Sequence, residues 1–542
     1  MSNSAIKTNY PALYTLVIVF FFWGFIAASN GVFIPFCKHH FSLDQFQSQL
    51  IDFAFYTAYY IGALILFIIS TLRKSDIVGK WGYKKSIIYG LLFSAVGAVA
   101  MIIGVKTDVY VGLLIGLFTV ALGYSLQQTA ANPFAIALGD PKTGSDRINL
   151  GGSINSFGTT IGPLILSFAL FGAVGDITNN QINNLNLDNV VVLYSVVGVL
   201  FLLAAAIFYF SKKMPDCVQE SEVETSHKSL RMFLVITVLL LVCMIPVFNS
   251  YKSEGFILLN FGDIEMNRMY CLIGAFVTVI GALVFAHLKA KKDSNGWGAL
   301  QYPQLALGLI ALFFYVGVEV SIGSNLGGLL NEEEFGGFSA AQIAPFVSMY
   351  WGALMIGRWC GAVLVFNLKK VTKIIALVAA PIMAFLLVIA VNTVAGHDMK
   401  MLYYFIVCVL VQVVAFILCK EKPVRTLFVF AVLAMIAMTV GLCTTGMIAV
   451  YAFLSGGLFC SIMWSNIYTL ATLGLGKYTS QGSSFLVMMI LGGGIIPPIQ
   501  GKLADIIGIH SSYVLPIICY AYIAFFAVVA KRILKKQEIQ ID

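Results

Sequence analysis

Long apolar stretches separated by short polar segments run along the whole chain, and this pattern predicts a helical membrane protein with many spans. A helix that crosses about 30 Å of hydrocarbon needs about 20 mostly apolar residues. The polar stretch from Ser211 to Arg231 interrupts the pattern and is the predicted linker between two halves. We expect about sixteen spans, at approximately 11–36, 47–71, 86–104, 109–138, 149–174, 189–211, 232–249, 269–288, 303–328, 342–366, 372–392, 400–419, 426–445, 446–475, 482–508 and 512–531.

Composition supports the membrane assignment and excludes several classes of protein. Of the 542 residues, 59% are apolar and only 11% are charged, whereas a soluble domain carries about 25% charged residues. Even a large soluble domain leaves about a quarter of its unfolded surface exposed, so a water-soluble chain cannot hide this much hydrocarbon. A soluble enzyme, a nucleic-acid-binding protein and a disordered scaffold are therefore excluded.

The net charge of +8 comes from basic residues in short loops, and their placement predicts the orientation of the chain. Lys and Arg gather on the cytoplasmic side of membrane proteins. With an even number of spans, the basic loops all fall on one side, while NNQINNLNLDN and NEEEF fall on the other. We therefore expect a multi-pass protein of the cytoplasmic (inner) membrane with both termini in the cytoplasm. The basic residues used are Arg73, Lys74, Lys80, Lys84, Lys85, Lys142, Arg147, Lys212, Lys213, Lys289, Lys291, Lys292, Lys369, Lys370, Lys373, Lys420, Lys422 and Arg425.

Three ionisable residues lie inside predicted spans, where a charge costs about 2.5–3.5 kcal/mol on insertion scales and so indicates a function. They are Asp52 in LIDFAFYTAYYIG, Glu319 in LFFYVGVEVSIGS and Arg358 in MIGRWCGAVL. Each carboxyl group is a candidate for proton titration. Alternatively, Asp52 lies at the level of the headgroups, Glu319 is a hydrogen-bonded structural acid, and Arg358 is a structural or gating charge that snorkels or pairs with a neighbour.

Uncharged polar side chains are more numerous inside the spans, above all in GYSLQQTAANPF and RINLGGSINSFGTT. An amide offers both a donor and an acceptor, which suits adjacent hydroxyls of a sugar, whereas helix–helix packing is the alternative role. Gln127 and Gln128 cannot both face one way on a helix, so we favour one of them. The candidate substrate-binding residues are Asn30, Gln128, Asn132, Asn149, Asn155, Ser156 and Tyr350.

The sequence gives no indication of a metal site or a cofactor. The ten cysteines are scattered and form no C-x-x-C pair, so neither a zinc site nor a disulfide framework is expected. The spans contain no Ser–His pair and no phosphate-binding loop, which argues against a membrane-embedded enzyme. Aromatic residues near the amides, such as Trp23, Tyr56 and Trp351, are candidates to stack against a sugar ring.

Several strings together resemble a known family. FFFWGFIAASNGVFIPF, QQTAANPF, RINLGGSINSFGTTIGP, FFYVGVEVSIGS, YWGALMIGR and GLGKYTSQGSSFLVMMILGGGIIPPIQG are similar to the major facilitator superfamily, and within it to the fucose/glucose/galactose:proton symporter family. The resemblance implies two six-helix bundles around a central cavity, working by alternating access, with a sugar moved alongside a proton.

The chain departs from this family at positions that matter for proton coupling. Fucose-transporting members carry an acidic residue after the first-helix asparagine, where this chain has Gly31, and a glutamate before TAANP, where it has Gln128. Glutamine at that position resembles the glucose/galactose branch. The usual glutamine of the fifth helix is replaced by Gly152, and Asp52 and Glu319 remain as carboxylates able to replace the missing acids.

The resemblance also implies a division into domains, because the family has twelve helices and this chain has about four more. We expect an N-terminal six-helix bundle at 1–212, a cytoplasmic linker with an extra helix pair at 213–302, a C-terminal six-helix bundle at 303–531, a second extra pair inserted at about 372–420, and a cytoplasmic tail at 532–542.

The sequence thus predicts a secondary active transporter and no enzyme. We expect it to import a monosaccharide, a hexose such as glucose or galactose, by proton symport through alternating access. The alternatives are a sodium-coupled or uniport sugar transporter, a carrier of fucose or N-acetylglucosamine, and, from another class, a membrane sugar sensor that does not transport. The expected partners are the sugar, the coupling ion and the lipid bilayer, with no nucleic acid.

Overall fold

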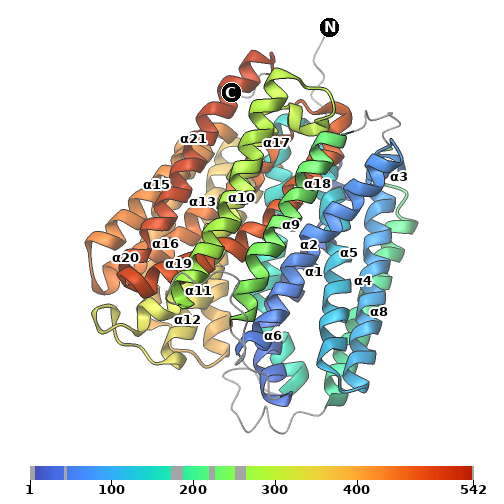
Figure 1. Ribbon diagram of the computed structural model, residues 1–542. Coiled ribbons are helices and arrows are strands. Elements are labelled where there is room, and N and C mark those ends of the chain that lie inside the picture. Colours follow the sequence, from blue (N-terminus) through green and yellow to red (C-terminus); the bar gives the residue numbers. More distant parts are fainter. Residues whose placement is uncertain (1–6, 42–44, 172–186, 219–225, 251–263, 540–542) are drawn as a thin grey trace.

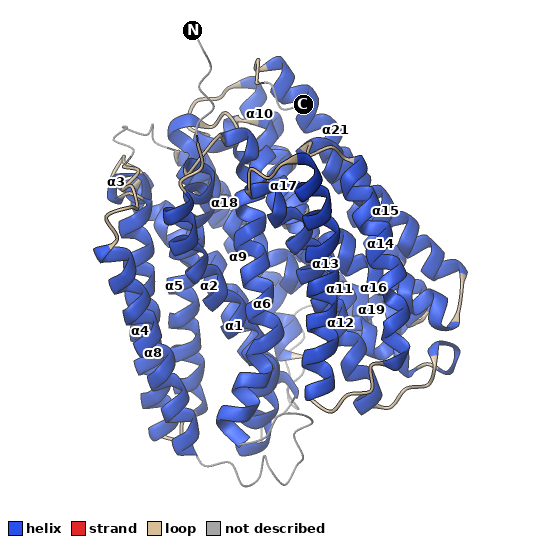
Figure 2. Ribbon diagram, turned by 180° about the vertical axis from the view of Figure 1, so that it is seen from behind, coloured by secondary structure: helices blue, strands red, loops and turns tan. Residues whose placement is uncertain are grey.

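The computed structural model describes residues 7–41, 45–171, 187–218, 226–250 and 264–539, and these residues form helices joined by loops, with no strand among them (Figure 2). Fourteen of the described helical segments are long and apolar enough to cross a membrane. Two further helices, α6 (Gly144–Phe171) and α12 (Ala340–Ala362), are long enough to cross but more polar, and they bring the total to sixteen. The predicted all-helical membrane fold is therefore confirmed.

The first half of the chain forms one bundle, which appears in blue and cyan in Figure 1. Its long helices pack against one another, with α1 on α6, α2 on α5 and α4 on both α5 and α8. The short helix α3 follows α2 and is capped by Asp76, whose carboxylate accepts a hydrogen bond from the Val78 backbone N–H at 3.1 Å. Besides α6, this N-terminal bundle contains α1 (Tyr10–His40), α2 (Gln45–Leu72), α3 (Ile77–Trp81), α4 (Tyr83–Lys106), α5 (Tyr110–Ala137) and α8 (Leu187–Phe210).

The second half repeats the arrangement, with α11 on α19, α12 on α16, and α15 on both α16 and α21. Two of its spans are broken into shorter helices, one between α16 and α17 and the other between α18 and α19. Besides α12, this C-terminal bundle contains α11 (Pro303–Asn331), α15 (Pro423–Cys443), α16 (Gly446–Cys460), α17 (Met463–Thr472), α18 (Thr479–Met488), α19 (Gly492–Ile507), α20 (Ile509–Ser512) and α21 (Val514–Lys536).

Glycines at equivalent crossings bring helix backbones into direct contact in both bundles. A Cβ on Gly24 of α1 would lie 2.0 Å from the Asn155 carbonyl oxygen of α6. In the second bundle, a Cβ on Gly492 of α19 would lie 2.0 Å from the Phe313 carbonyl oxygen of α11. No side chain fits at either place, so these crossings need glycine and set the distance between the inner helices.

Two helix pairs lie outside the bundles, on opposite faces of the molecule. The first pair, α9 (His227–Asn249) and α10 (Ile264–Lys292), packs against α2 on one side and against α11 and α19 on the other. It lies at the front of Figure 1, between the two bundles. The second pair, α13 (Lys370–Val394) and α14 (Ile406–Leu418), packs on α12, and α13 is in front in Figure 2.

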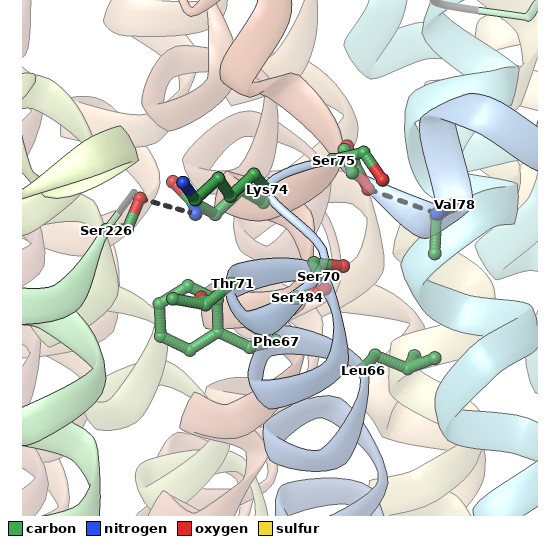
Figure 3. Close-up of a pocket in the computed structure, with 11 residues that line it drawn as sticks. Leu66, Phe67, Ser70, Thr71, Lys74, Ser75, Val78, Ser226 and Ser484 are labelled. Carbon is green, nitrogen blue, oxygen red and sulfur yellow. Dashed lines mark hydrogen bonds between the residues drawn. The ribbon is translucent and has the colours of Figure 1, made fainter. Parts of the chain in front are cut away.

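The bundles touch at the end of the molecule that carries both termini, at the top of Figure 1. The Ser483 hydroxyl of α18 donates to the Thr129 carbonyl of α5 at 2.7 Å, and the Tyr10 hydroxyl donates to the Val365 carbonyl at 2.9 Å. Figure 3 shows a small pocket at this end, where the turn after α2 meets Ser226 and Ser484. Its volume of about 20 Å³ is enough for about one water molecule.

Candidate functional site

A cavity of about 210 Å³ lies between the two bundles and receives side chains from both. Helices α1, α2, α5 and α6 form one wall, and α11, α12 and the break between α16 and α17 form the other. Its polar and aromatic lining residues are Phe20, Trp23, Phe55, Tyr56, Tyr59, Gln128, Asn132, Asn149, Asn155, Ser156, Thr159, Tyr315, Glu319, Trp351, Arg358, Ser461, Trp464 and Ser465.

The wall formed by the N-terminal bundle carries amides. Asn132 donates from Nδ2 to the Gln128 carbonyl at 3.1 Å, while its Oδ1 is buried and has no hydrogen-bond partner within the described part of the chain. Asn155 donates from Nδ2 to the Phe20 carbonyl at 3.1 Å. Each amide is thus held by one backbone contact, and at Asn132 the carbonyl oxygen of the side chain is left without a partner among the described residues, which is costly for a buried acceptor.

The structure decides between the two neighbouring glutamines. Gln128 lines the cavity, whereas Gln127 is fully buried behind the wall. The Gln127 Oε1 accepts a hydrogen bond from Trp23 Nε1 at 3.1 Å, and its Nε2 donates to the Ser94 hydroxyl at 3.1 Å. Gln127 therefore holds the indole of Trp23 in place at the cavity wall, and Gln128 is the glutamine that faces the cavity.

The wall formed by the C-terminal bundle carries an ion pair. The Arg358 Nη2 lies 2.9 Å from the Glu319 carboxylate, and each side chain is only 13% exposed. The Tyr315 hydroxyl donates to the same carboxylate oxygen at 2.9 Å. Tyr315 and Glu319 are four residues apart on α11 and so share one face of the helix, while Arg358 comes from α12.

Arg358 also connects the two bundles. Its Nη1 donates to the Ser156 hydroxyl of α6 at 2.7 Å, and its Nε donates to the Ser461 carbonyl at the break after α16 at 3.1 Å. A Cβ at Gly152 would lie 3.3 Å from the Arg358 Cδ. The absence of a side chain at Gly152 therefore leaves space for the arginine, which would have to shift by a few tenths of an ångström to accommodate a Cβ there.

Two further candidates, Asn149 and Tyr350, make hydrogen bonds to other parts of the protein. The Asn149 Oδ1 accepts a hydrogen bond from the Ser465 hydroxyl of α17 at 2.5 Å, so it bridges the bundles as well as lining the cavity. Tyr350 is fully buried outside the lining, and its hydroxyl donates to the Glu319 carbonyl at 2.6 Å. Tyr350 thus supports the backbone at Glu319, and we leave it out of the substrate-binding set.

The structure does not describe the side chains of two predicted residues. Asn30 lies on α1 and Asp52 lies on α2, but their side chains are not among the described residues. Their predicted roles in sugar binding and proton coupling stay predictions.

Several lining residues were not among the sequence candidates, notably Ser461, Trp464 and Ser465. They lie where α16 ends and α17 begins, within the string CSIMWSNIYT. The sequence does carry a signal for them, because polar residues interrupt an apolar run at this point and indicate a break in the helix. Irregular backbone within a membrane is tolerated only where it is buried in protein or lines a water-filled cavity.

Neither metal binding nor cysteine chemistry is indicated by the described residues. No group of three His, Cys, Asp or Glu side chains in that part of the chain is arranged to hold a metal ion. Its cysteines are free thiols. The cavity lining presents amides, hydroxyls, aromatic rings and the paired side chains of Glu319 and Arg358.

Two helical bundles around a shared polar cavity, with broken helices beside it, are the architecture of a secondary transporter. The chain belongs to the Major Facilitator Superfamily, whose sequence profile matches residues 15–419. It is accordingly a multi-pass membrane transporter and not an enzyme, and the family resemblance of its motifs is confirmed.

The similar proteins include sugar transporters. The chain is 31% identical over 532 residues to the glucose/galactose transporter of Brucella abortus, covering 98% of this chain and 97% of that protein. It is 27% identical over 524 residues to the L-fucose-proton symporter of Escherichia coli, covering 94% and 91% of the two chains.

Solved structures confirm the fold. The crystal structure of the Escherichia coli fucose:proton symporter, FucP, matches with a TM-score of 0.63 at 21% identity, over 97% of this chain and 99% of that chain. A second FucP structure, in the outward conformation, matches with a TM-score of 0.62 at 22% identity, over 96% and 98% of the chains. The major facilitator fold is therefore the fold of this protein.

Proposed function

We propose that the protein imports a monosaccharide, a hexose such as glucose or galactose, together with a proton, by alternating access of the central cavity. The names of the relatives support a sugar and a proton, and the position of Gln128 before TAANP supports the glucose/galactose branch. The observation that carries the proposal is the composition of the cavity wall. Its described lining combines neutral amides with a single acid, Glu319, and a single base, Arg358.

The amide-bearing wall is the proposed sugar site. Gln128, Asn132 and Asn155 come from two helices of the N-terminal bundle and face the same cavity. Each amide can donate to one hydroxyl and accept from the next, which matches the adjacent hydroxyls of a pyranose. The indole of Trp23, held by Gln127, offers a flat apolar surface to the ring.

The ion pair is the proposed proton site. While Glu319 is ionised, it holds Arg358 at 2.9 Å, and the same guanidinium holds Ser156 of the other bundle. Protonation of Glu319 removes the charge that Arg358 faces and weakens a contact network that joins the bundles. Proton binding is therefore coupled to the relative position of the bundles, as symport requires. Asp52 remains the alternative proton site.

The proposed location is the cytoplasmic membrane, with both termini in the cytoplasm. The termini lie at the same end of the molecule as α3 and the basic loop around it, which the distribution of Lys and Arg assigns to the cytoplasm (Figure 1). Import then begins from the opposite end of the cavity.

Transport by the purified full-length protein in liposomes tests the proposal. A panel of radiolabelled glucose, galactose, fucose and N-acetylglucosamine is offered under an imposed proton gradient, a sodium gradient, or none. We expect a hexose to accumulate only with the proton gradient. Accumulation with sodium alone, or equilibration without any gradient, supports a sodium-coupled transporter or a uniporter, and sugar binding without translocation supports a sensor.

A further inference from the structure

The second helix pair encloses a pocket that is separate from the transport cavity. The pocket has a volume of about 450 Å³ and lies between the start of α13, the end of α14 and the segment that follows α12. That segment includes Val365, whose carbonyl accepts the hydrogen bond from Tyr10 near the start of the chain. The pocket is therefore at the end of the molecule that carries both termini, where the helices leave the membrane.

The pocket has apolar walls and a basic rim. Its apolar lining residues are Leu364, Leu368, Ile374, Leu377, Phe416 and Ile417. Leu377 and Phe416 are only 5% and 6% exposed, whereas Ile374 is 45% exposed and so extends the apolar surface outward. The charged lining residues are three lysines and one glutamate, namely Lys370, Lys373, Lys420 and Glu421.

The charges on the rim are only partly neutralised. Lys373 is paired with Glu421, with its Nζ 2.8 and 3.1 Å from the two carboxylate oxygens. Lys370 and Lys420 are exposed and have no carboxylate within 4.0 Å among the described residues. The backbone at Lys420 and Glu421 has φ of 54° and 59°, so a tight left-handed turn holds both residues at the rim.

We propose that this pocket binds an anionic phospholipid, with its phosphate at Lys370 and Lys420 and an acyl chain along the apolar walls. Basic pockets between transmembrane helices on the cytoplasmic side are suited to anionic lipid headgroups. The combination of a basic rim and an apolar wall at the membrane surface matches a lipid, which supplies both a negative headgroup and a hydrocarbon tail.

The position of the pocket gives bound lipid a route to the transport machinery. The α13 helix packs along α12, where the Cys360 thiol contacts the Leu377 carbonyl at 3.6 Å and a Cβ on Gly352 would lie 2.6 Å from Val388. Arg358 lies on the same stretch of α12. A lipid wedged beneath α13 and α14 therefore braces the helix that carries the arginine of the ion pair.

Lipid binding to the purified full-length protein tests this proposal. Native mass spectrometry and thermal unfolding in detergent are measured with added phosphatidylglycerol, phosphatidylcholine or inorganic phosphate. We expect phosphatidylglycerol to bind and to raise the unfolding temperature, and Lys370→Gln with Lys420→Gln to weaken its binding about fivefold for each lysine removed. The matched control is Lys400→Gln, an exposed lysine at the opposite end of the same helix pair.

The outcomes separate the possible ligands. Equal binding of phosphatidylcholine, or unchanged phosphatidylglycerol binding in the Lys370/Lys420 double variant, overturns the proposal. Displacement of the lipid by millimolar inorganic phosphate, with the same loss in the variant, would identify a free-phosphate site instead and also overturn it. These measurements involve no sugar and no proton gradient, so they stand or fall independently of the proposed transport function.

Discussion

The two walls of the transport cavity have the same scaffold and different chemistry. In each bundle, a glycine lets the inner helices cross in backbone contact, at Gly24 with Asn155 and at Gly492 with Phe313. The wall from the N-terminal bundle then carries neutral amides and aromatic rings, while the wall from the C-terminal bundle carries Glu319 with its arginine. Repetition of the fold therefore leaves the side chains of the two walls free to differ, and the proposed function assigns sugar recognition to one wall and proton coupling to the other.

The division is not complete, because Arg358 reaches across it. The guanidinium donates to Ser156 in one bundle and to Glu319 in the other. Arg358 therefore links Glu319 directly to the opposite bundle. The comparison thus yields a testable claim. Variants of the wall from the C-terminal bundle should alter proton coupling, and variants of the wall from the N-terminal bundle should alter sugar affinity.

Removing the acid from the C-terminal wall should have the largest effect. We expect Glu319→Gln to abolish sugar accumulation driven by an acid exterior, because the amide cannot take up a proton, while sugar counterflow persists. The wild-type rate should fall as the exterior is made more alkaline, and the variant should lose this dependence. Glu333→Gln, in an exposed segment after α11, is the control. Unchanged active uptake in Glu319→Gln would remove this residue from the mechanism.

Removing Arg358 should lower the stability of the protein more than it lowers the affinity for sugar. Arg358→Met leaves a buried carboxylate without its cation, and breaking such a pair costs about 3–5 kcal/mol of unfolding free energy. Thermal unfolding in detergent measures the loss. The Glu319→Gln/Arg358→Met double variant should regain much of it, because no unpaired charge remains. A double variant no more stable than Arg358→Met would mean that the pair is not what stabilises this region.

Variants of the amide wall should change affinity and leave coupling intact. Asn132→Leu removes a buried acceptor that has no partner among the described residues, and we expect a loss of about 10- to 100-fold in sugar affinity. The transport KM at fixed proton gradient measures this loss. The comparison fails if the variant keeps its KM and instead loses the response to the proton gradient.

The smallest effect on sugar affinity is expected from Gln127, which is buried behind the amide-bearing wall. Gln127→Leu leaves the Trp23 indole without its acceptor at 3.1 Å, so the ring is less firmly held and sugar affinity should fall only about fivefold. Quenching of indole fluorescence by added sugar, compared with a Trp23→Phe variant, reports whether the ring has moved. Gln127→Glu keeps the acceptor and should restore the wild-type quenching. If Gln127→Leu binds sugar and quenches as the wild type does, Gln127 only fills space.

The sequence alone determined the properties that depend on local composition. Runs of apolar residues predicted about sixteen spans, because the energy of placing a segment in a bilayer is nearly a sum over its own residues. The same argument indicated that Glu319 and Arg358 have a role, because a charge within a span is costly. It did not reveal the partner of either residue.

Only the tertiary structure decided which of these residues meet. Glu319 and Arg358 pair across 39 positions of sequence, and Arg358 reaches Ser156 across 202. Whether Gln127 or Gln128 faces the cavity depends on the rotation of α5, and Tyr350 lies behind the wall because of the rotation of α12. Helix rotation and crossing are set by side-chain packing between segments far apart in the chain, so hydropathy, which is read one segment at a time, contains no record of them.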